Sequence, residues 1–270
     1  MKEQEALAIN LKRRFPFRLG TTSYIVPADL LANVEFLAGK VDDIELVLFE
    51  SDEISNIPDD GVVQTIRNIA EENDHTYTVH LPLDIQLGSS DEAERSKSVD
   101  RCLRVIARIS PADPFAYVIH FHGDRRGDSP SKDISLWQTN LEKSIEELLE
   151  SGIAPRDLCV ETLDYSYKLI EKLVFDYDLS ICLDIGHILL NAHSLDAYLD
   201  RYIEQCRVIH LHGISDGKDH RYISDKESDH LSILFSRICS NKAEARVVTL
   251  EVFNKKDLIR SVVALERFMR

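Results

Sequence analysis

The residues best suited to chemistry stand between Ile181 and His187, where the chain reads Ile-Cys-Leu-Asp-Ile-Gly-His. An apolar run of strand length leads to Asp184, and His187 follows three residues later. A buried carboxylate is strongly unfavourable unless a cation or hydrogen bonds balance it, so this pair indicates a metal site where a strand meets its loop. The alternative is structural, with Asp184 capping the following helix and His187 in a polar rim.

Short apolar runs typical of β-strands recur along the chain and alternate with segments that have helical spacing of apolar residues. The strands are expected at residues 18–21, 44–49, 76–80, 116–121, 158–161, 181–184, 208–211 and 247–252. The helices are expected at residues 27–37, 62–69, 98–109, 135–150, 167–174, 195–203, 231–238 and 258–268.

Continuous apolar strands are buried on both faces, which is typical of a parallel sheet covered by helices. Eight such βα units in 270 residues close most economically into a (β/α)8 TIM barrel. We therefore expect a single α/β domain over residues 1–270, with residues 1–14 as a charged N-terminal extension. The alternative is an open doubly wound sheet, but residues 19–23 read Leu-Gly-Thr-Thr-Ser and lack the GxGxxG phosphate loop of that fold.

Composition restricts the partners and the cellular location. The net charge of -15, from 47 acids and 32 bases, repels polyanions, so extended nucleic acid is not an expected partner. No apolar run approaches the roughly 18 residues of a membrane helix, and residues 1–14 lack a signal-peptide pattern. The five dispersed cysteines contain no CxxC pair and are expected to be reduced thiols. These features predict a cytoplasmic protein.

Active sites of TIM barrels lie at the carboxyl ends of the strands, and histidines and carboxylates collect there in this chain. Three carboxylates in one funnel would repel one another unless cations lay among them. Imidazole with carboxylate suits Zn, Mn or Fe better than Mg or Ca, so a divalent transition metal is expected. The residues at these ends are His80, His120, His122, Glu161, Asp184, His187, His210, His212 and Glu251.

Within the pairs His120/His122 and His210/His212, the spacing of two places both side chains on one side of the strand. One member of each pair can bind metal while the other contacts the substrate or orients a ligand. Glu50 and Arg125 are weaker candidates for substrate contacts. An exposed loop acid explains Glu50 equally well, and a solvated loop charge is the commoner explanation for Arg125. Glu45 is expected to be an acid inside the barrel with a structural partner.

This pattern resembles the xylose isomerase-like TIM barrels, which include sugar isomerases and epimerases and endonuclease IV. The resemblance covers nearly the whole chain, and its most specific mark is the DxxH motif from Asp184 to His187. It implies that one divalent ion is held, as in the sugar epimerases, by Glu161, Asp184, His210 and Glu251.

Endonuclease IV-like members add histidines that build a phosphoesterase centre with two or three metal ions. His80, His120 and His220 match those positions, so the resemblance implies that they and His187 extend the site. The endonucleases space the acid and histidine of the last loop as DxH, whereas Asp219 adjoins His220 here. This departure leaves a third ion unsupported by the resemblance.

Residues 20–27, 41–50 and 77–84 resemble a narrower group, the cobamide-remodelling phosphodiesterases called CbiR. Those enzymes cleave the nucleotide loop of vitamin B12-type cofactors. The resemblance implies a metal-dependent phosphodiesterase for a corrinoid or another small molecule, with Glu161 and Glu251 as catalytic residues. The alternative is a one-ion sugar isomerase or epimerase in which these acids move a proton beside a carbonyl. A non-catalytic binding barrel would leave the ligand set unexplained.

Overall fold

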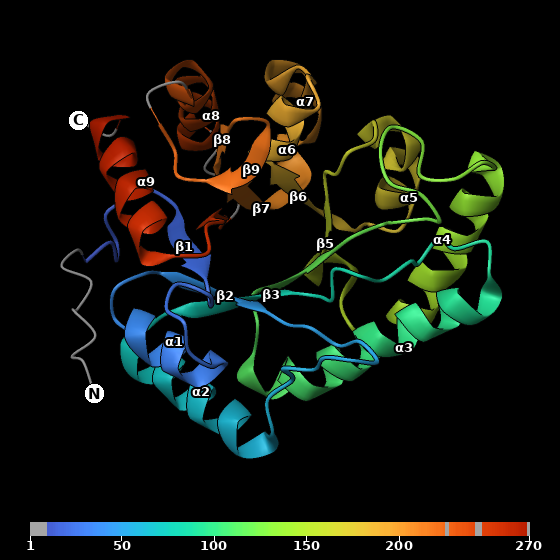
Figure 1. The fold of residues 1–270 in the computed structure, drawn as a ribbon, viewed down its shortest axis with the longest axis horizontal. Coiled ribbons are helices and arrows are strands. Elements are labelled where there is room, and N and C mark those ends of the chain that lie inside the picture. Colours follow the sequence, from blue (N-terminus) through green and yellow to red (C-terminus); the bar gives the residue numbers. More distant parts are fainter. Residues whose placement is uncertain (1–9, 225–226, 241–244, 269–270) are drawn as a thin grey trace.

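The computed structural model describes residues 10–224, 227–240 and 245–268. Eight parallel strands close a barrel in the order β1-β10-β7-β6-β5-β4-β3-β2, and helices surround it (Figure 1). The predicted TIM barrel is therefore confirmed, and the open sheet is wrong because β1 pairs with both β2 and β10. The barrel strands are β1 (Arg18–Thr22), β2 (Asp43–Val47), β3 (Thr76–His80), β4 (Ala116–Ile119), β5 (Leu158–Glu161), β6 (Ser180–Asp184), β7 (Cys206–Leu211) and β10 (Val247–Leu250).

The helices cover the outside of the barrel, and an antiparallel hairpin of β8 (Gly213–Ser215) and β9 (Lys218–Arg221) follows β7. None of the described helices is both long and apolar enough to span a bilayer. The helices are α1 (Leu30–Leu37), α2 (Asp60–Asn73), α3 (Glu92–Ile109), α4 (Ile134–Glu150), α5 (Glu171–Asp176), α6 (Ile185–Leu190), α7 (Leu195–Tyr202), α8 (Ser228–Ser240) and α9 (Lys255–Phe268).

Several boundaries differ from the sequence-based prediction. Helix α3 begins at Glu92 and not at residue 98, because the Asp91 side chain caps it by accepting a hydrogen bond from the Ala93 N–H. Strand β4 ends at Ile119, so His120 lies in the loop that follows it. Helix α6 was not predicted because it is only six residues long. The β8–β9 hairpin was not predicted because its sequence lacks apolar alternation.

Of the predicted N-terminal extension at residues 1–14, residues 1–9 lie outside the described part of the chain. Leu11 is buried in the core beneath the helices, and Lys12 donates hydrogen bonds to the backbone carbonyls of Asn73 and Asp74. The described end of the extension is therefore packed against the barrel.

Alternation along the strands fills the barrel interior in layers. A small apolar cluster lies inside, formed by Ala116, Val118, Cys159, Cys182 and Val208. Two residues further along the chain, near the end of each strand or just past it, stand residues that were predicted to bind metal, which are His120, Glu161, Asp184 and His210. The apolar cluster thus forms a floor beneath a polar layer.

Asn33 holds the loop that connects β1 to α1. Its buried amide oxygen accepts hydrogen bonds from the N–H groups of Ile25 and Val26, each at 2.9 Å. Its amide nitrogen donates to the carbonyl oxygens of Val26 and Ala28, each at 3.1 Å. One side chain therefore satisfies several backbone polar groups of the loop that carries Tyr24 to the cavity.

We expect Asn33→Ala to lower the free energy of unfolding by about 2–4 kcal/mol, because it leaves several buried backbone groups without partners. Urea unfolding followed by circular dichroism measures the change. Asn68→Ala, on the exposed face of α2, is the control and should shift the free energy by less than about 0.5 kcal/mol. Equal effects of the two substitutions would contradict this role of Asn33.

Candidate metal centre

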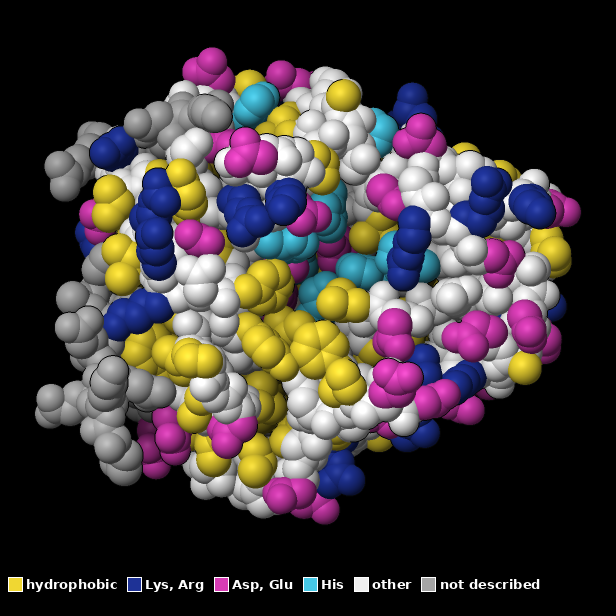
Figure 2. All heavy atoms as spheres, in the orientation of Figure 1, with side chains coloured by type: hydrophobic (Ala, Val, Ile, Leu, Met, Phe, Trp, Pro, Cys, Tyr) yellow, Lys and Arg dark blue, Asp and Glu magenta, His cyan; other side chains and the backbone are white. Residues whose placement is uncertain are grey.

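The polar layer opens into a cavity of about 430 Å³ at the carboxyl ends of the strands. Figure 2 shows this hollow near the middle of the face, with histidine and acidic side chains inside it and hydrophobic side chains along one side. Among the predicted site residues, those lining the cavity are His80, His120, His122, Glu161, His187, His220 and Glu251.

Glu161, the last residue of β5, lies at the centre of this layer and is almost fully buried. Its Oε2 is 2.9 Å from His120 Nε2, 3.3 Å from His80 Nε2 and 3.6 Å from His210 Nδ1. Its Oε1 is 3.3 Å from His187 Nδ1. Four imidazoles from four parts of the chain therefore surround one carboxylate.

His210 links this carboxylate to two others. Its Nδ1 lies 3.3 Å from Glu251 Oε2 and 3.9 Å from Asp184 Oδ2, while its Nε2 lies 2.7 Å from Glu45 Oε2. Glu45 was expected to be an interior acid with a structural partner, and His210 is that partner. Because Glu45 holds Nε2, the other ring nitrogen, Nδ1, faces the carboxylates of Glu161, Asp184 and Glu251.

His80, His120 and Glu161 form a second group whose ligand atoms lie within 4.8 Å of one another. His80 Nδ1 donates to the Leu81 carbonyl at 2.8 Å. Nε2, which lies 3.3 Å from Glu161 Oε2, is therefore the ring nitrogen that can act as a ligand. His122 lines the cavity but lies outside the groups of possible ligands among the described residues. Of the pair left open by the sequence, His120 is the one whose geometry suits a metal ligand.

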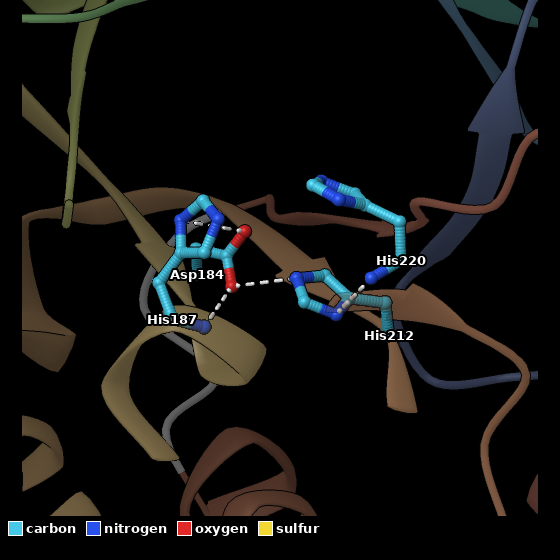
Figure 3. A group of neighbouring side chains, drawn as sticks. All are labelled: Asp184, His187, His212 and His220. Atoms are coloured by element: carbon cyan, nitrogen blue, oxygen red, sulfur yellow. Dashed lines mark hydrogen bonds and ion pairs between the residues drawn. The ribbon is translucent and has the colours of Figure 1, made fainter. Parts of the chain in front are cut away.

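Asp184, His187, His212 and His220 form a third group (Figure 3). Asp184 Oδ1 accepts a hydrogen bond from the His187 backbone N–H at 2.7 Å, so the carboxylate does cap α6. Its Oδ2 lies 3.3 Å from the His187 ring. The structural and metal-ligand interpretations of Asp184 are therefore compatible, because each uses a different oxygen.

His212 supports Asp184 from behind and does not line the cavity. Its Nδ1 accepts a hydrogen bond from the His220 N–H at 3.0 Å, so its Nε2 carries the proton and points at Asp184 Oδ1, 3.1 Å away. A Cβ at Gly186 would overlap the His212 ring, which explains the glycine between Asp184 and His187. His212 was predicted to bind substrate, but this placement makes it an orienting residue.

Asp219, which was not among the predicted ligands, joins the third group from β9. Its Oδ1 is 3.1 Å from His220 Nδ1 and its Oδ2 is 3.8 Å from His187 Nε2. Adjacent strand residues normally point to opposite sides, but His220 has a left-handed backbone with φ of 51°, which breaks the alternation. The adjacency of Asp219 and His220 therefore does not prevent both from facing the site.

Charge balance explains the pKa shifts in the centre. Burial by itself raises the pKa of Glu161 and of Glu251. Neighbouring imidazoles outweigh burial and hold both pKa values well below their usual range, chiefly His120 and His210 for Glu161 and His210 and His220 for Glu251. Burial lowers the pKa of His220, yet Glu251 and nearby acids outweigh it and raise the pKa to about 9. Protons and metal cations therefore compete for the same imidazoles, and metal affinity should fall as pH falls.

The unpaired atoms of the centre fit a divalent ion. Asp184 Oδ2, His210 Nδ1 and Glu251 Oε2 are buried without a hydrogen-bond partner among the described residues. Ligands of a tetrahedral ion lie about 3.4 Å from one another, which is close to the 3.3–3.9 Å separations around His210 Nδ1. Nitrogen and carboxylate donors together suit Zn, Mn or Fe.

Two predicted contact residues lie away from the cavity. Glu50 is ion-paired with Arg104 at 3.2 Å, and Arg125 is exposed on the loop after β4. Neither lines the cavity. The cavity is also lined by residues that were not predicted to belong to the site, including Asp164, Asn191 and Asp219. Of these, only Asp219 could have been found from the sequence, because it adjoins His220.

We expect Glu45→Gln to weaken zinc binding by about 10–100-fold, because the amide removes the charge that orients His210 and raises its basicity. Competition with a chromophoric chelator measures the affinity. Asp43→Asn is the matched control, since Asp43 is a buried acid on the same strand that bonds to Thr76 and not to His210. Unchanged affinity in Glu45→Gln would show that His210 needs no such partner.

Gly186→Ala should displace His212 and lower the free energy of unfolding by about 1–3 kcal/mol, together with a loss of bound metal. Gly61→Ala is the control, since Gly61 also lies near the start of a helix but its Cβ would meet only Asp59 Oδ1, at 3.3 Å. Thermal melting and elemental analysis of both proteins provide the comparison. A Gly186→Ala protein with native stability and metal content would refute the packing role.

Comparison with known proteins gives the family. Residues 38–266 match the family described as xylose isomerase-like TIM barrel. Similar solved structures include a D-tagatose 3-epimerase-like protein (TM-score 0.73, 19% identity, 94% of this chain and 97% of that chain). Endonuclease IV from Thermus thermophilus is also similar (TM-score 0.66, 19% identity, 93% of this chain and 97% of that chain).

A third similar structure is D-psicose 3-epimerase from Clostridium cellulolyticum (TM-score 0.69, 14% identity, 94% of this chain and 98% of that chain). No curated protein matches the chain at the level of sequence. The barrel topology, the DxxH motif at the end of β6 and the match over most of its length together establish that the chain belongs to the xylose isomerase-like TIM barrel family.

Proposed function

We propose that the protein is a metal-dependent phosphodiesterase that hydrolyses a phosphoester in the nucleotide loop of cobamides. The observation that carries the hydrolase proposal is the number of candidate ligands. His80, His120 and Glu161 form one group, and Asp184, His187 and His220 belong to another. A one-ion site has no need of both groups, whereas a phosphoesterase centre with two or three ions uses them.

The chain's own residues have distinct roles in this proposal. Glu161, Asp184, His210 and Glu251 hold the central ion, and His80, His120, His187 and His220 extend the site. A bound divalent ion supplies charge for the phosphate oxygens and lowers the pKa of a water from about 16 toward 7. Glu161 and Glu251 both line the cavity, so either carboxylate could orient the attacking water and accept its proton.

The cobamide substrate is supported by the three sequence segments that resemble the cobamide-remodelling phosphodiesterases. The net charge of -15 disfavours extended nucleic acid, while a corrinoid carries one phosphodiester on a bulky body of low charge. A cytoplasmic location agrees with the four buried free cysteines, Cys102, Cys159, Cys182 and Cys206.

The second candidate is a sugar isomerase or epimerase with one ion, in which Glu161 and Glu251 move a proton beside a carbonyl. Both acids line the cavity, and the similar solved structures include the D-tagatose 3-epimerase-like protein. Under this alternative, the group of His80 and His120 would have no role in metal binding.

Metal content and hydrolysis distinguish the two candidates. Protein purified without chelator should contain about two or three Zn, Mn or Fe ions per chain. Glu161→Ala should lose most of this metal, because Glu161 contributes to more than one ligand group. Glu71→Ala, which removes an exposed acid paired with Arg67, is the matched control and should retain it.

The metal-loaded protein should hydrolyse bis(p-nitrophenyl) phosphate and release the lower-ligand nucleoside or nucleotide from a cobamide, detected by mass spectrometry. Activity in Glu161→Ala should fall by at least about 100-fold. One ion per chain together with epimerisation of D-tagatose would instead establish the second candidate. Metal-free protein that stays inactive after anaerobic reconstitution would exclude both.

A further inference from the structure

Five apolar side chains on segments beyond the strand ends line the cavity, and we call them the apolar collar. They lie on the segments that follow β1, β2, β3 and β10 and at the end of α6, although these segments are far apart in the sequence. The collar consists of Tyr24, Phe49, Leu83, Leu190 and Phe253.

Four collar side chains are unusually exposed. Tyr24, Leu83, Leu190 and Phe253 are 37–42% exposed, and they make up half of the large exposed apolar side chains among the described residues. Single exposed apolar residues are ordinary, but a group of them beside a polar cavity indicates a surface that a ligand covers. Figure 2 shows such hydrophobic side chains along one side of the hollow.

The collar is continuous with the candidate metal centre. Phe253 packs against the His220 ring with 5.3 Å between centroids, and Tyr24 meets Phe49 edge to face at 5.7 Å. Leu190 lies on the same short helix as His187. A ligand whose anionic group lies at the centre therefore places its remaining atoms against the collar.

Charge in the cavity restricts that ligand further. Lysine and arginine side chains lie at the edge of the hollow in Figure 2, but none of the described ones lines the cavity. Carboxylates do line it, including Asp164 and Asp219. A second anionic group on the ligand would thus meet these carboxylates and no lysine or arginine in the described lining of the cavity.

We propose that the apolar collar selects phosphoesters with an apolar, uncharged body and that the cavity rejects those with a second anionic group. This inference rests on the proposed function, because it takes the centre to bind one phosphoryl group. It assigns specificity to side chains that play no part in holding the metal.

Binding of phosphonates, which cannot be hydrolysed, tests the collar separately from catalysis. We expect zinc-loaded protein to bind phenylphosphonate about tenfold more tightly than methylphosphonate, because the ring covers apolar collar surface. It should bind 4-carboxyphenylphosphonate about tenfold more weakly than phenylphosphonate. Isothermal titration calorimetry measures all three affinities.

The double variant Leu83→Ala/Leu190→Ala should reduce the preference for phenylphosphonate to about threefold or less. Leu136→Ala is the matched control, since Leu136 is 42% exposed on α4 and lies outside the cavity. Equal binding of phenyl- and methylphosphonate by the native protein overturns the inference, as does failure to bind either. A preference unchanged in the double variant also overturns it.

Hydrolysis of phenyl p-nitrophenyl phosphate by the same samples distinguishes the two proposals. Absence of hydrolysis with the phenylphosphonate preference retained overturns the proposed function alone. Hydrolysis with equal rates for the phenyl and methyl p-nitrophenyl esters, after correction for their uncatalysed rates, overturns the collar alone.

Discussion

The rest of this site depends on one buried carboxylate. Glu161 faces four imidazoles, from β3, from the loop after β4, from α6 and from β7, at 2.9–3.6 Å. A carboxylate that is 1% exposed needs positive charge close by, so these elements must converge on it whether the charge comes from protons or from metal ions. The same requirement couples folding to metal binding, because an ion that replaces the protons stabilises only the assembled barrel.

A set of supporting contacts explains how the ligands keep their directions. Glu45 holds His210, the Leu81 carbonyl holds His80, and the cap of α6 with His212 holds Asp184. In each case the contact occupies one atom of the ligand and leaves the other atom facing the centre. The contacts of the barrel itself therefore orient the ligands. A Cβ at Gly186 would displace the His212 ring and so change the orientation of Asp184.

Much of this centre could be predicted because strands have a period of two. Once β7 is recognised, inward-facing Val208 implies that His210 also faces inward, and the active ends of a parallel barrel lie on one side. The loops do not follow such a rule. His212 lies behind Asp184, and the left-handed backbone at His220 places Asp219 in the site. Both placements depend on contacts with α6, which a local sequence pattern does not encode.

Charge restricts the ligands that the cavity can attract. The chain carries a net charge of -15, and acids line its cavity without a described lysine or arginine. Positive charge at the centre must then come from bound ions or from protonated imidazoles, and it acts over a short distance because the carboxylates around it screen it.

An anionic group is therefore attracted only where it touches the ions, while the remainder of the molecule meets either acids or the apolar collar. A polynucleotide offers charge along its whole length and gains little from one such contact. Under the proposed function, a compound with one phosphoryl group and an apolar, uncharged body would make both favourable contacts at once, and a polyanion would make only one of them.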